Sequence, residues 1–565
     1  MSAWAVRQHG SAGVIRALLA RRDIPEHASE LFLFPDFQRD TFDPMRFRHM
    51  PLVIERMRTA LARAEQIVIF GDYDADGTCG AMIMKDYLDR AGHRAYQVYQ
   101  PDRYAEGYGL KRTHVHQFHE SGATLLITID CGVTSLEEIA YANSLGIDVM
   151  VLDHHIVPPV WPAAYAIINP KHPEEEYPNK DICGSGLSYK VVEALVRAGV
   201  GGVTPGWERW LLDLVAIATV ADMMDVRGEN RALITYGIQV IRKGRRPGLK
   251  RLLESARVHV PELSAEDIAF MVAPRINAAS RMRHASIAAD MLTARSAEQA
   301  RELVGTLEGI NTERKLLVEE IVSDAHGRIA RLERIPEAIV VGDMSWPPGV
   351  LGIVATRIME VYHRPVFVWG SANGVLKGSC RAYGEENIVD AMRSVSDGVL
   401  LDFGGHQKSG GFALIPEQLT EFQGSIESFF VTATPTAPPH TVVFDGALRM
   451  QDLTTDIISE IRQLEPHGIG NPRPVFVFPD VRVSHVKEFG KIKQHVRCVM
   501  TDGVSSISAL QFFARPPLVR ALASGSHMDI AGSIELGCFG RICEPRVRII
   551  DVRPAGELLY DTQVV

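Results

Sequence analysis

Short apolar runs recur along the first part of the chain, with polar turns and longer helical stretches between them. Residues 66–70, QIVIF, are apolar and rich in β-branched side chains, which is typical of a buried strand, and Gly71 ends the run. Residues 124–129 and 147–152 have the same character. Strands that alternate with helices in this way predict a parallel sheet in an α/β fold.

Each of these three runs is followed at once by acidic residues or histidines. These residues are Asp72, Asp74, Asp76, Asp130, Asp153, His154 and His155. A fourth element, the strongly apolar helix predicted for residues 211–221, is followed by Asp222. Because ligands bind at the carboxyl ends of parallel strands, we expect these side chains to converge at one edge of the sheet.

Converging carboxylates predict a metal centre. They repel one another unless protons or cations neutralise them, and their oxygens suit Mg²⁺ or Mn²⁺, while imidazole suits manganese, iron or zinc. A single acidic turn is more often structural, and residues 72–77 also match the start of a calcium-binding EF-hand loop. The twelfth position of that loop needs a bidentate Glu and is Ile83 here, so the calcium reading fails.

The length of 565 residues predicts three or four domains. We expect a helical N-terminal segment (1–55), an α/β unit with the acidic strands (56–225) and a helical connector (226–332). A second α/β unit (333–439) and a β-rich unit (440–565) follow. Within the connector, residues 311–332 have helical periodicity and Thr312 can cap that helix.

Composition restricts the class of protein and its possible location. The apolar content of 46% and charged content of 23% are ordinary for a folded globular protein. The net charge of −9 gives no global basic footprint, so any nucleic-acid contact must come from local patches. Seven scattered cysteines without a CxxC pair predict reduced thiols in a cytoplasmic protein, and no apolar run has the length of a membrane span.

Several groups in the chain could hold phosphate. Arg103 follows a short predicted strand at residues 96–99, and two glycine-rich loops are expected in the second α/β unit, at residues 378–381 (GSCR) and 403–406 (FGGH). They offer exposed main-chain N–H groups, a hydroxyl, a guanidinium and an imidazole. A basic run at residues 242–251 is more often a solvated helix face.

The last unit contains short alternating strands, and Asp502-Gly503 is a strong hairpin signal between two of them. This pattern predicts a small β-barrel of the OB type, which binds single strands through a basic groove and aromatic stacking. Candidate contacts are Phe489, Lys491, Lys493, Phe512 and Phe513, although Phe on a strand is more often part of the core.

Four short segments carry a resemblance to a known family. Residues 71–77 (GDYDADG), 129–132 (IDCG), 153–155 (DHH) and 220–222 (VAD) resemble, in order and spacing, the four motifs of the DHH phosphoesterase superfamily. Within it the chain is most similar to the RecJ family of bacterial single-strand-specific 5′-to-3′ DNA exonucleases. The resemblance runs essentially from end to end. It implies a DHH catalytic domain, a DHHA1-like substrate-binding domain and an OB-like domain in the three units that contain strands.

The resemblance also implies roles for individual residues. Two Mn²⁺ or Mg²⁺ ions would be held by Asp72, Asp74, Asp76, Asp130, His154 and Asp222, with Asp130 as the bridging carboxylate. His155 would contact the phosphate, and Asp153 would orient the histidines. The DNA backbone or its 5′ end would be held by Arg103, Arg275, Asn277, Ser379, Arg381, Gly404, Gly405 and His406. The family implies a role in recombination and repair, single-stranded DNA as a partner, single-strand-binding protein and a helicase as further partners, and a monomer.

Two positions depart from the family pattern, and one other function stays open. Phe70 stands where some branches have a metal-binding His, and Pro347 stands where RecJ sequences commonly have a His before Gly349-Val350. The alternative is a DHH phosphodiesterase acting on short RNA or cyclic dinucleotides. Such enzymes generally have no terminal OB-like unit, so residues 440–565 distinguish the two. A non-catalytic DNA-binding relative would be expected to have lost metal ligands, which this chain keeps.

Overall fold

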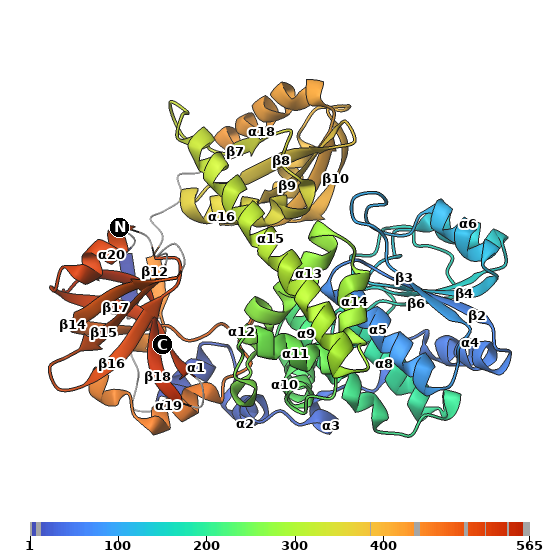
Figure 1. Ribbon diagram of the computed structural model, residues 1–565, viewed down its shortest axis with the longest axis horizontal. Helices are drawn as coiled ribbons and strands as arrows, with labels where there is room; N and C mark the ends of the chain where they lie inside the picture. Colours follow the sequence, from blue (N-terminus) through green and yellow to red (C-terminus); the bar gives the residue numbers. More distant parts are fainter. Residues whose placement is uncertain are drawn as a thin grey trace.

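The computed structural model describes residues 3–6, 13–384, 386–433, 441–490, 495–514, 516–539 and 542–556. Figure 1 shows the parallel-sheet unit on the right, a set of helices in the centre, a second α/β unit above them and a β-barrel on the left. The α/β class, the helical connector and the C-terminal barrel predicted from the sequence are confirmed.

The first sheet is entirely parallel and brings the acidic residues to one edge. Its strand order is β3-β2-β4-β5-β6. Gly71 lies opposite Ile129, and Ile129 lies opposite Leu152, so the residues that follow each strand begin at the same level. The strands are β2 (Gln66–Gly71), β3 (Tyr96–Tyr99), β4 (Ala123–Ile129), β5 (Asp148–Leu152) and β6 (Ala166–Ile168).

Helices cover both faces of this sheet because its strands are apolar on both sides. Side chains of α4 (Met50–Ala62), α5 (Ala75–Arg90) and α8 (Gly184–Arg197) pack with Ile67 and Ile69 in one buried cluster. On the other face, α6 (Arg112–Glu120) and α7 (Leu136–Ser144) bury Val68 and Phe70. Phe70 therefore belongs to the core and faces away from the acidic edge.

The connector is helical, and one long helix links it to the second α/β unit (Figure 1). That helix, α15 (Ala297–Ile329), has 33 residues and is capped by Ser296, whose side chain accepts from the N–H of Gln299. The prediction of a helix beginning at Thr312 is wrong, because Ala300, Val304 and Leu307 continue the buried stripe toward the N-terminus. The other helices used below are α9 (Leu212–Ala221), α10 (Gly228–Arg242), α11 (Pro247–Ser255), α13 (Ala273–Met282) and α14 (Ser286–Leu292).

The second α/β unit has a mixed sheet of order β10-β11-β9-β8-β7. The two glycine-rich segments expected to be loops are strands, so that prediction is wrong. They belong to β9 and β10. Gly404 and Gly405 of β10 pair with Gly411 and Gly410 of β11, so the backbone carries no side chains at these paired positions. The strands are β7 (Ile339–Gly342), β8 (Val366–Ala372), β9 (Val375–Arg381), β10 (Leu400–His406) and β11 (Ser409–Leu414), with α16 (Leu351–Tyr362) packed against them.

The C-terminal sheet closes into a five-stranded barrel, because β14 pairs with both β15 and β17. One long strand, β14, bends at a register shift where Asp480 has a positive φ of 51°. Asp502 closes the predicted hairpin by accepting from the N–H groups of Val504 and Ser505. The strands are β14 (Phe476–Phe489), β15 (His495–Thr501), β16 (Ser506–Gln511), β17 (His527–Phe539) and β18 (Ile542–Pro554).

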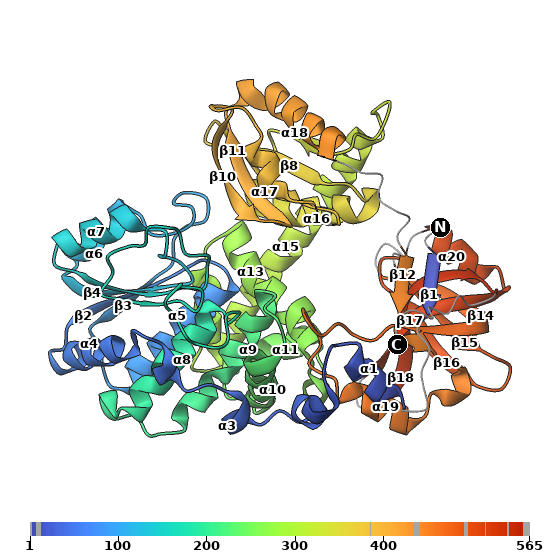
Figure 2. The same cartoon turned by 180° about the vertical axis from the view of Figure 1, so that it is seen from behind.

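The N-terminal segment packs with the C-terminal barrel. Leu18 and Leu19 of α1 (Val14–Ala20) and Phe32 of α2 (Ser29–Leu33) are buried in the same apolar cluster as Phe476 and Val481 of the barrel. The strand β1 (Ala3–Val6) also pairs in parallel with β12 (Thr441–Phe444) beside the barrel (Figure 2). The N-terminal segment therefore packs as part of the C-terminal unit.

Five cysteines are free and buried, namely Cys79, Cys131, Cys183, Cys380 and Cys498. Cys543 is disulfide-bonded, so the prediction of reduced thiols is wrong at that position. Within the described part of the chain, no helix combines the length and apolar character needed to cross a membrane.

Candidate metal centre and substrate cleft

The acidic motif of residues 72–77 lies at the turn between β2 and α5. Asp74 caps α5 by accepting from the N–H groups of Asp76 and Gly77. A Cβ atom on Gly77 would lie 2.4 Å from the main-chain oxygen of Asp72, so only glycine allows the helix to begin this close to the strand. This close approach sets Asp72, Asp74 and Asp76 around one turn.

Asp76 is held by the N-terminus of a second helix. Its two carboxylate oxygens accept from the N–H groups of Gly184, at 2.6 Å, and Ser185, at 2.7 Å, at the start of α8. A helix N-terminus offers free N–H donors, so this arrangement fixes the position of the Asp76 carboxylate inside the protein.

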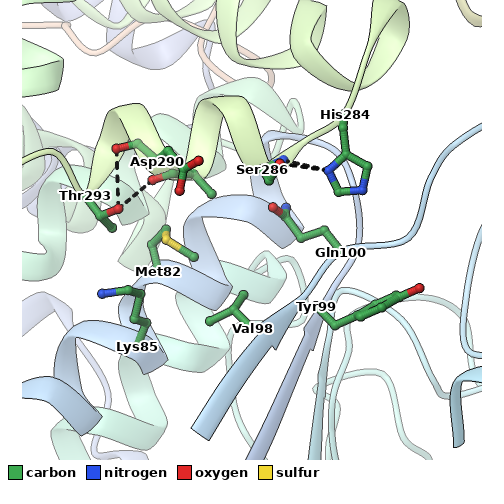
Figure 3. A pocket seen from close by; sticks show the side chains of 10 residues that line it. Met82, Lys85, Val98, Tyr99, Gln100, His284, Ser286, Asp290 and Thr293 are labelled. Carbon is green, nitrogen blue, oxygen red and sulfur yellow. Dashed lines mark hydrogen bonds between the residues drawn. The ribbon is translucent and has the colours of Figure 1, made fainter. Parts of the chain in front are cut away.

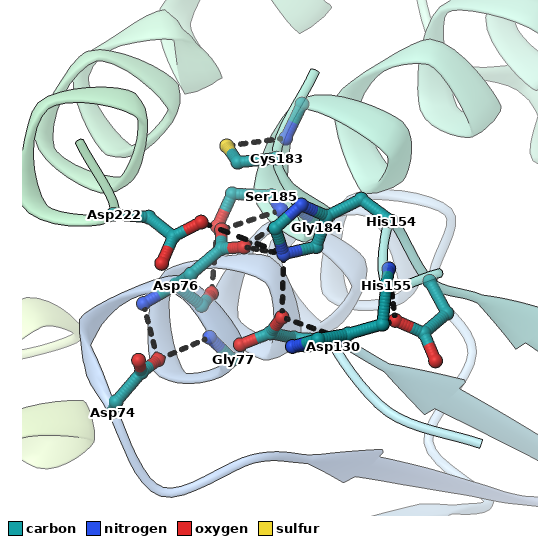
Figure 4. Close-up of polar contacts among 12 residues, drawn as sticks. Asp74, Asp76, Gly77, Asp130, His154, His155, Cys183, Gly184, Ser185 and Asp222 are labelled. Atoms are coloured by element: carbon teal, nitrogen blue, oxygen red, sulfur yellow. Dashed lines mark hydrogen bonds and ion pairs between the residues drawn. The ribbon is translucent and has the colours of Figure 1, made fainter. Parts of the chain in front are cut away.

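His154 lies between three of the acids, as Figure 4 shows. Its Nε2 atom is 3.1 Å from Asp130, 3.4 Å from Asp222 and 3.9 Å from Asp76. These acids come from the ends of a strand (β4) and of a helix (α9) and from the first turn of another helix (α5). The fold thus gathers side chains that are up to 146 residues apart in the sequence.

The ligand atoms form three overlapping groups, each within 4.8 Å. They are Asp72, Asp74 and Asp130; Asp130, His154 and His155; and Asp76, His154 and Asp222. Asp130 belongs to two of these groups and His154 to two. All six residues predicted as metal ligands therefore lie in one cluster.

Burial makes this cluster electrostatically costly without a cation. Burial and the neighbouring acids raise the pKa of Asp130 and of Asp72 well above the usual range, and raise the pKa of Asp222 to about 9. Burial lowers the pKa of His154, which favours the neutral imidazole that binds metals. Buried oxygens of Asp72 and Asp222 have no hydrogen-bond donor. Unsatisfied carboxylate oxygens beside a neutral imidazole fit divalent cations.

His155, which belongs to one of these ligand groups, also pairs with Asp153, which belongs to none of them. The Nδ1 atom of His155 is 2.7 Å from Asp153 Oδ1, and Asp153 also accepts from the N–H groups of His155 and Val133. Burial opposes the charge on His155, but the hydrogen bond and the negative charge of Asp153 outweigh it and raise the pKa of His155. The pair keeps a proton on His155 at the edge of the metal cluster.

A cleft of about 650 Å³ lies between the first and second α/β units. On one side it is lined by Arg103 and Tyr108, and on the other by Ser379 and Gly404. The hydroxyl of Tyr108 donates to the main-chain oxygen of Asp130 and lies 3.3 Å from His155, so the cleft reaches the acidic cluster. His406, at the end of β10, lies near enough to His155 for the two charges to interact.

Guanidinium groups from three parts of the chain gather beside the cleft. Burial and the positive charges of Arg103, Arg314 and Arg381 lower the pKa of Arg281 to about 9. Arg103 also lies 4.7 Å above the ring of Tyr73. The negative charge of Asp74 offsets this effect only in part, and guanidinium groups gathered in this way suit an anion such as phosphate.

Arg281 is a residue that the sequence reasoning missed. It lies on α13 four residues after Asn277, whose side-chain oxygen accepts from the N–H of Ala75 at the acidic turn. Residues four apart share a helix face, so this spacing could have identified Arg281. Arg275, on the same helix, is buried, and its guanidinium donates to Glu308 and to the main-chain oxygen of Met271.

The departure at Pro347 falls next to this anion site. The Arg281 guanidinium donates to the main-chain oxygen of Gly349. The hydroxyl of Tyr104 donates to the main-chain oxygen of Arg281. Three parts of the chain therefore meet at the turn that contains Pro347.

Exposed aromatic rings lie on the barrel near the end of β16. Phe512 is 40% exposed and Phe513 is 63% exposed, and both pack edge-on against His495. Phe489 is half-buried beside the same histidine. Two other predicted contacts, Lys491 and Lys493, lie outside the described residues.

A second cavity, of about 270 Å³, lies between the edge strand β3 and the helices α5 and α14 (Figure 3). Lys85, Tyr99, His284 and Asp290 line it, and none of the predicted metal ligands does. Gln100 separates it from the acidic turn by donating to the main-chain oxygen of Asp72. We assign the chemistry to the cleft, because Tyr108 of its lining donates to the main-chain oxygen of Asp130.

Comparison with known proteins gives three domain matches. The DHH family, N-terminal domain, matches residues 66–219; the DHHA1 domain matches residues 336–432; and the RecJ OB domain matches residues 444–551. The single-stranded-DNA-specific exonuclease RecJ of Bacillus subtilis is 30% identical over 553 residues, covering 97% of this chain and 69% of its own. The Escherichia coli protein of the same name is 34% identical over 443 residues, covering 75% and 76%.

Solved structures agree with these matches. The crystal structure of RecJ from Thermus thermophilus in complex with Mn²⁺ has a TM-score of 0.78 at 27% identity, covering 98% of this chain and 80% of its own. A structure of exonuclease RecJ bound to manganese has a TM-score of 0.61 at 31% identity, covering 70% and 97%. From the domain matches, the sequence identity and the shared fold together, we conclude that the chain belongs to the RecJ family.

Proposed function

We propose that this protein hydrolyses single-stranded DNA from the 5′ end to mononucleotides, with two Mn²⁺ or Mg²⁺ ions, in recombination and repair. The observation that carries the proposal is the set of three overlapping ligand groups around Asp130 and His154, open to a cleft with clustered guanidinium groups. The relatives that support it are named single-stranded-DNA-specific exonucleases.

The residues divide the work as follows. Asp130 would be shared by the two ions, Asp72 and Asp74 would help to hold one of them, and Asp76, His154 and Asp222 would help to hold the other. Bound ions neutralise phosphate charge and lower the pKa of a water molecule. His155, which Asp153 keeps protonated, stabilises the charge that develops on the phosphate oxygens.

The second group of residues binds the strand. Arg103, Arg281, Ser379 and Arg381 hold the 5′ end or the first phosphate, and the bare backbone of β10 at Gly404 and Gly405 lets the strand approach closely, with His406 at the end of that strand. Asn277 fixes the acidic turn, and Arg275 supports α13 by its bond to Glu308. A cleft of about 650 Å³ has the size of a small-ligand site, which supports the proposal that it takes a strand end.

The domain boundaries are part of the same proposal. We assign residues 56–225 to catalysis, 226–332 to the connector, 333–439 to substrate binding and 440–565 to strand capture, with residues 1–55 as the N-terminal segment. A cytoplasmic location, a monomeric state, and single-strand-binding protein and a helicase as partners complete it, by analogy with the family.

The test is digestion of two long single strands, one labelled at the 5′ end and one at the 3′ end, with Mn²⁺ and with chelator. We expect early, metal-dependent release of the 5′ label as a mononucleotide, with duplex DNA spared, and no release by Asp130→Asn. Survival of the long strands while short RNA or cyclic dinucleotides are cleaved would favour the alternative substrate class.

A further inference from the structure

A buried arginine of the connector binds the segment that leads into the barrel. Arg231 lies in the first turn of α10 and is only 2% exposed. Its guanidinium donates to the main-chain oxygens of residues 463, 464, 465 and 466 and of Phe32, and it lies 4.0 Å above the Phe32 ring. None of these five acceptors is a carboxylate.

The same segment is held from the other side by Arg22. Arg22 donates to the side-chain oxygen of Asn471, at 2.7 Å, and to the main-chain oxygen of Pro472. Asn471 is fully buried and donates in turn to the main-chain oxygens of Leu464 and Pro466. We call residues 463–472 the docking turn, and Arg22, Arg231 and Asn471 the Arg231 cluster.

The chemistry of this cluster is unusual for a structural contact. A buried cation is costly, and burial together with Arg22 lowers the pKa of Arg231 to about 10. The carbonyls it binds follow α19 (Thr455–Arg462), where the helix dipole is negative. A planar guanidinium with five donors can bind four successive residues at once, which no other side chain can do.

The docking turn also rests against the loop that carries Asp222. The N–H of Val226 donates to the main-chain oxygen of Ile469, and a Cβ atom on Gly470 would lie 2.2 Å from the Asp225 carboxylate. Ion pairs from Glu266 to Arg473 and Arg548 extend the contact to the barrel itself. The barrel is therefore fastened a few residues from a predicted metal ligand.

We propose that Arg231 is a positioning residue that fixes the barrel relative to the metal centre and thereby strengthens the retention of long strands. The inference rests on the proposed function of the barrel in strand capture. When two sites hold one strand, the second binding event is intramolecular, and its strength depends on the fixed distance between the sites. Loosening one site lowers the affinity for a strand that reaches both, while a strand that reaches only the metal centre is unaffected.

The test compares Arg231→Met with wild type on a long single strand and on a tetranucleotide. We expect the KM for the long strand to rise about tenfold, with kcat and the tetranucleotide rate within about twofold. The radius of gyration of the DNA-free variant, from small-angle X-ray scattering, should increase. Arg231→Lys should give intermediate values, because an ammonium cannot reach as many carbonyls. Arg251→Met, at an exposed arginine of α11 that pairs with Glu254, is the matched control.

Two results would overturn the inference. One is an equal loss of rate on both substrates, which would mean that Arg231 supports the catalytic domain as a whole. The other is an unchanged KM for the long strand. If the KM and the radius of gyration are both unchanged, the positioning role of Arg231 is refuted. If the KM is unchanged but the radius of gyration increases, the barrel has moved without an effect on long strands, and the proposed strand capture is refuted. If Arg231→Met does not fold, Arg22→Met, which removes the opposite side of the cluster, is measured in the same way.

Discussion

At the scale of single residues, the Asp153–His155 pair separates metal binding from transition-state stabilisation. Asp153 touches His155 and two main-chain N–H groups, and it is in none of the metal-ligand groups. We expect Asp153→Asn to lower kcat about a hundredfold, because His155 loses the partner that keeps it protonated and oriented. Mn²⁺ affinity, measured by calorimetry, should change little.

The matched control is Glu137→Gln, an exposed acid on α7 of the same domain. It should leave both kcat and Mn²⁺ affinity unchanged. A large loss of Mn²⁺ affinity in Asp153→Asn would instead make Asp153 part of the metal site.

His467, in the docking turn, gives a pH dependence. Burial, with Arg473, Arg22 and Arg231 nearby, lowers its pKa well below the usual value of 6.5. As the pH falls through 6.5, the unfolded chain takes up a proton that the folded chain refuses, so the free energy of unfolding falls by up to about 1.4 kcal/mol per pH unit. Thermal unfolding at pH 7.5 and 5.5 should therefore show a smaller loss of Tm in His467→Gln than in wild type. The control His116→Gln, at an exposed histidine, should show the same loss of Tm as wild type. Equal losses of Tm in all three proteins would mean that His467 does not cause the pH dependence.

At the scale of elements, α13 presents two functional side chains on one face. Asn277 binds the acidic turn, and Arg281 lies among the guanidinium groups of the cleft. We expect Arg281→Met to raise the KM for a 5′-phosphorylated strand about tenfold while a 5′-hydroxyl strand changes less, because the variant loses a charge-assisted contact. Steady-state kinetics on the two strands measures this difference.

The control is Arg283→Met, an exposed arginine just past α13 that pairs with Glu313. It should leave the ratio of the two KM values as in wild type. If Arg281→Met weakens both strands equally, Arg281 acts on the strand as a whole and not on its 5′ phosphate.

The end of β16 offers a second element to test. Stacking of a base on an exposed aromatic ring contributes about 1–3 kcal/mol, so Phe513→Ala should weaken binding of a long single strand by roughly tenfold or more. Fluorescence anisotropy with the Asp130→Asn protein, which is expected not to digest the strand, measures this affinity. Val504→Ala, at the 92% exposed tip of the β15–β16 hairpin, is the control. Equal affinities would place the strand on another face of the barrel.

At the scale of the whole molecule, the features that could be predicted from the sequence are those that depend on neighbouring residues, namely strands, helices and the ligands at their ends. The strands of the parallel sheet and the ligands that follow them were identified because each run is short, apolar and interrupted by glycine or acid. Glycine also misled the prediction for β9 and β10, because opposed glycines such as Gly404 and Gly411 can pair in a ladder as readily as they form loops.

Contacts between distant residues were beyond the sequence. Arg22 and Asn471 are 449 residues apart, and nothing near either position indicates the other. The cluster of Arg103, Arg281 and Arg381 has the same origin, since three parts of the chain contribute one guanidinium each. A single sequence shows the residue types but not the surfaces that packing brings together.

The packing of Leu18, Leu19 and Phe32 into the barrel has a consequence for biosynthesis. These side chains find their apolar partners, such as Phe476 and Val481, only after about 450 more residues have been synthesised, which takes roughly 20 to 90 s at bacterial rates of synthesis. Until then the early helices keep apolar side chains in water. Between the synthesis of α1 and the synthesis of the barrel strands, the nascent chain is therefore open to aggregation or to binding by chaperones.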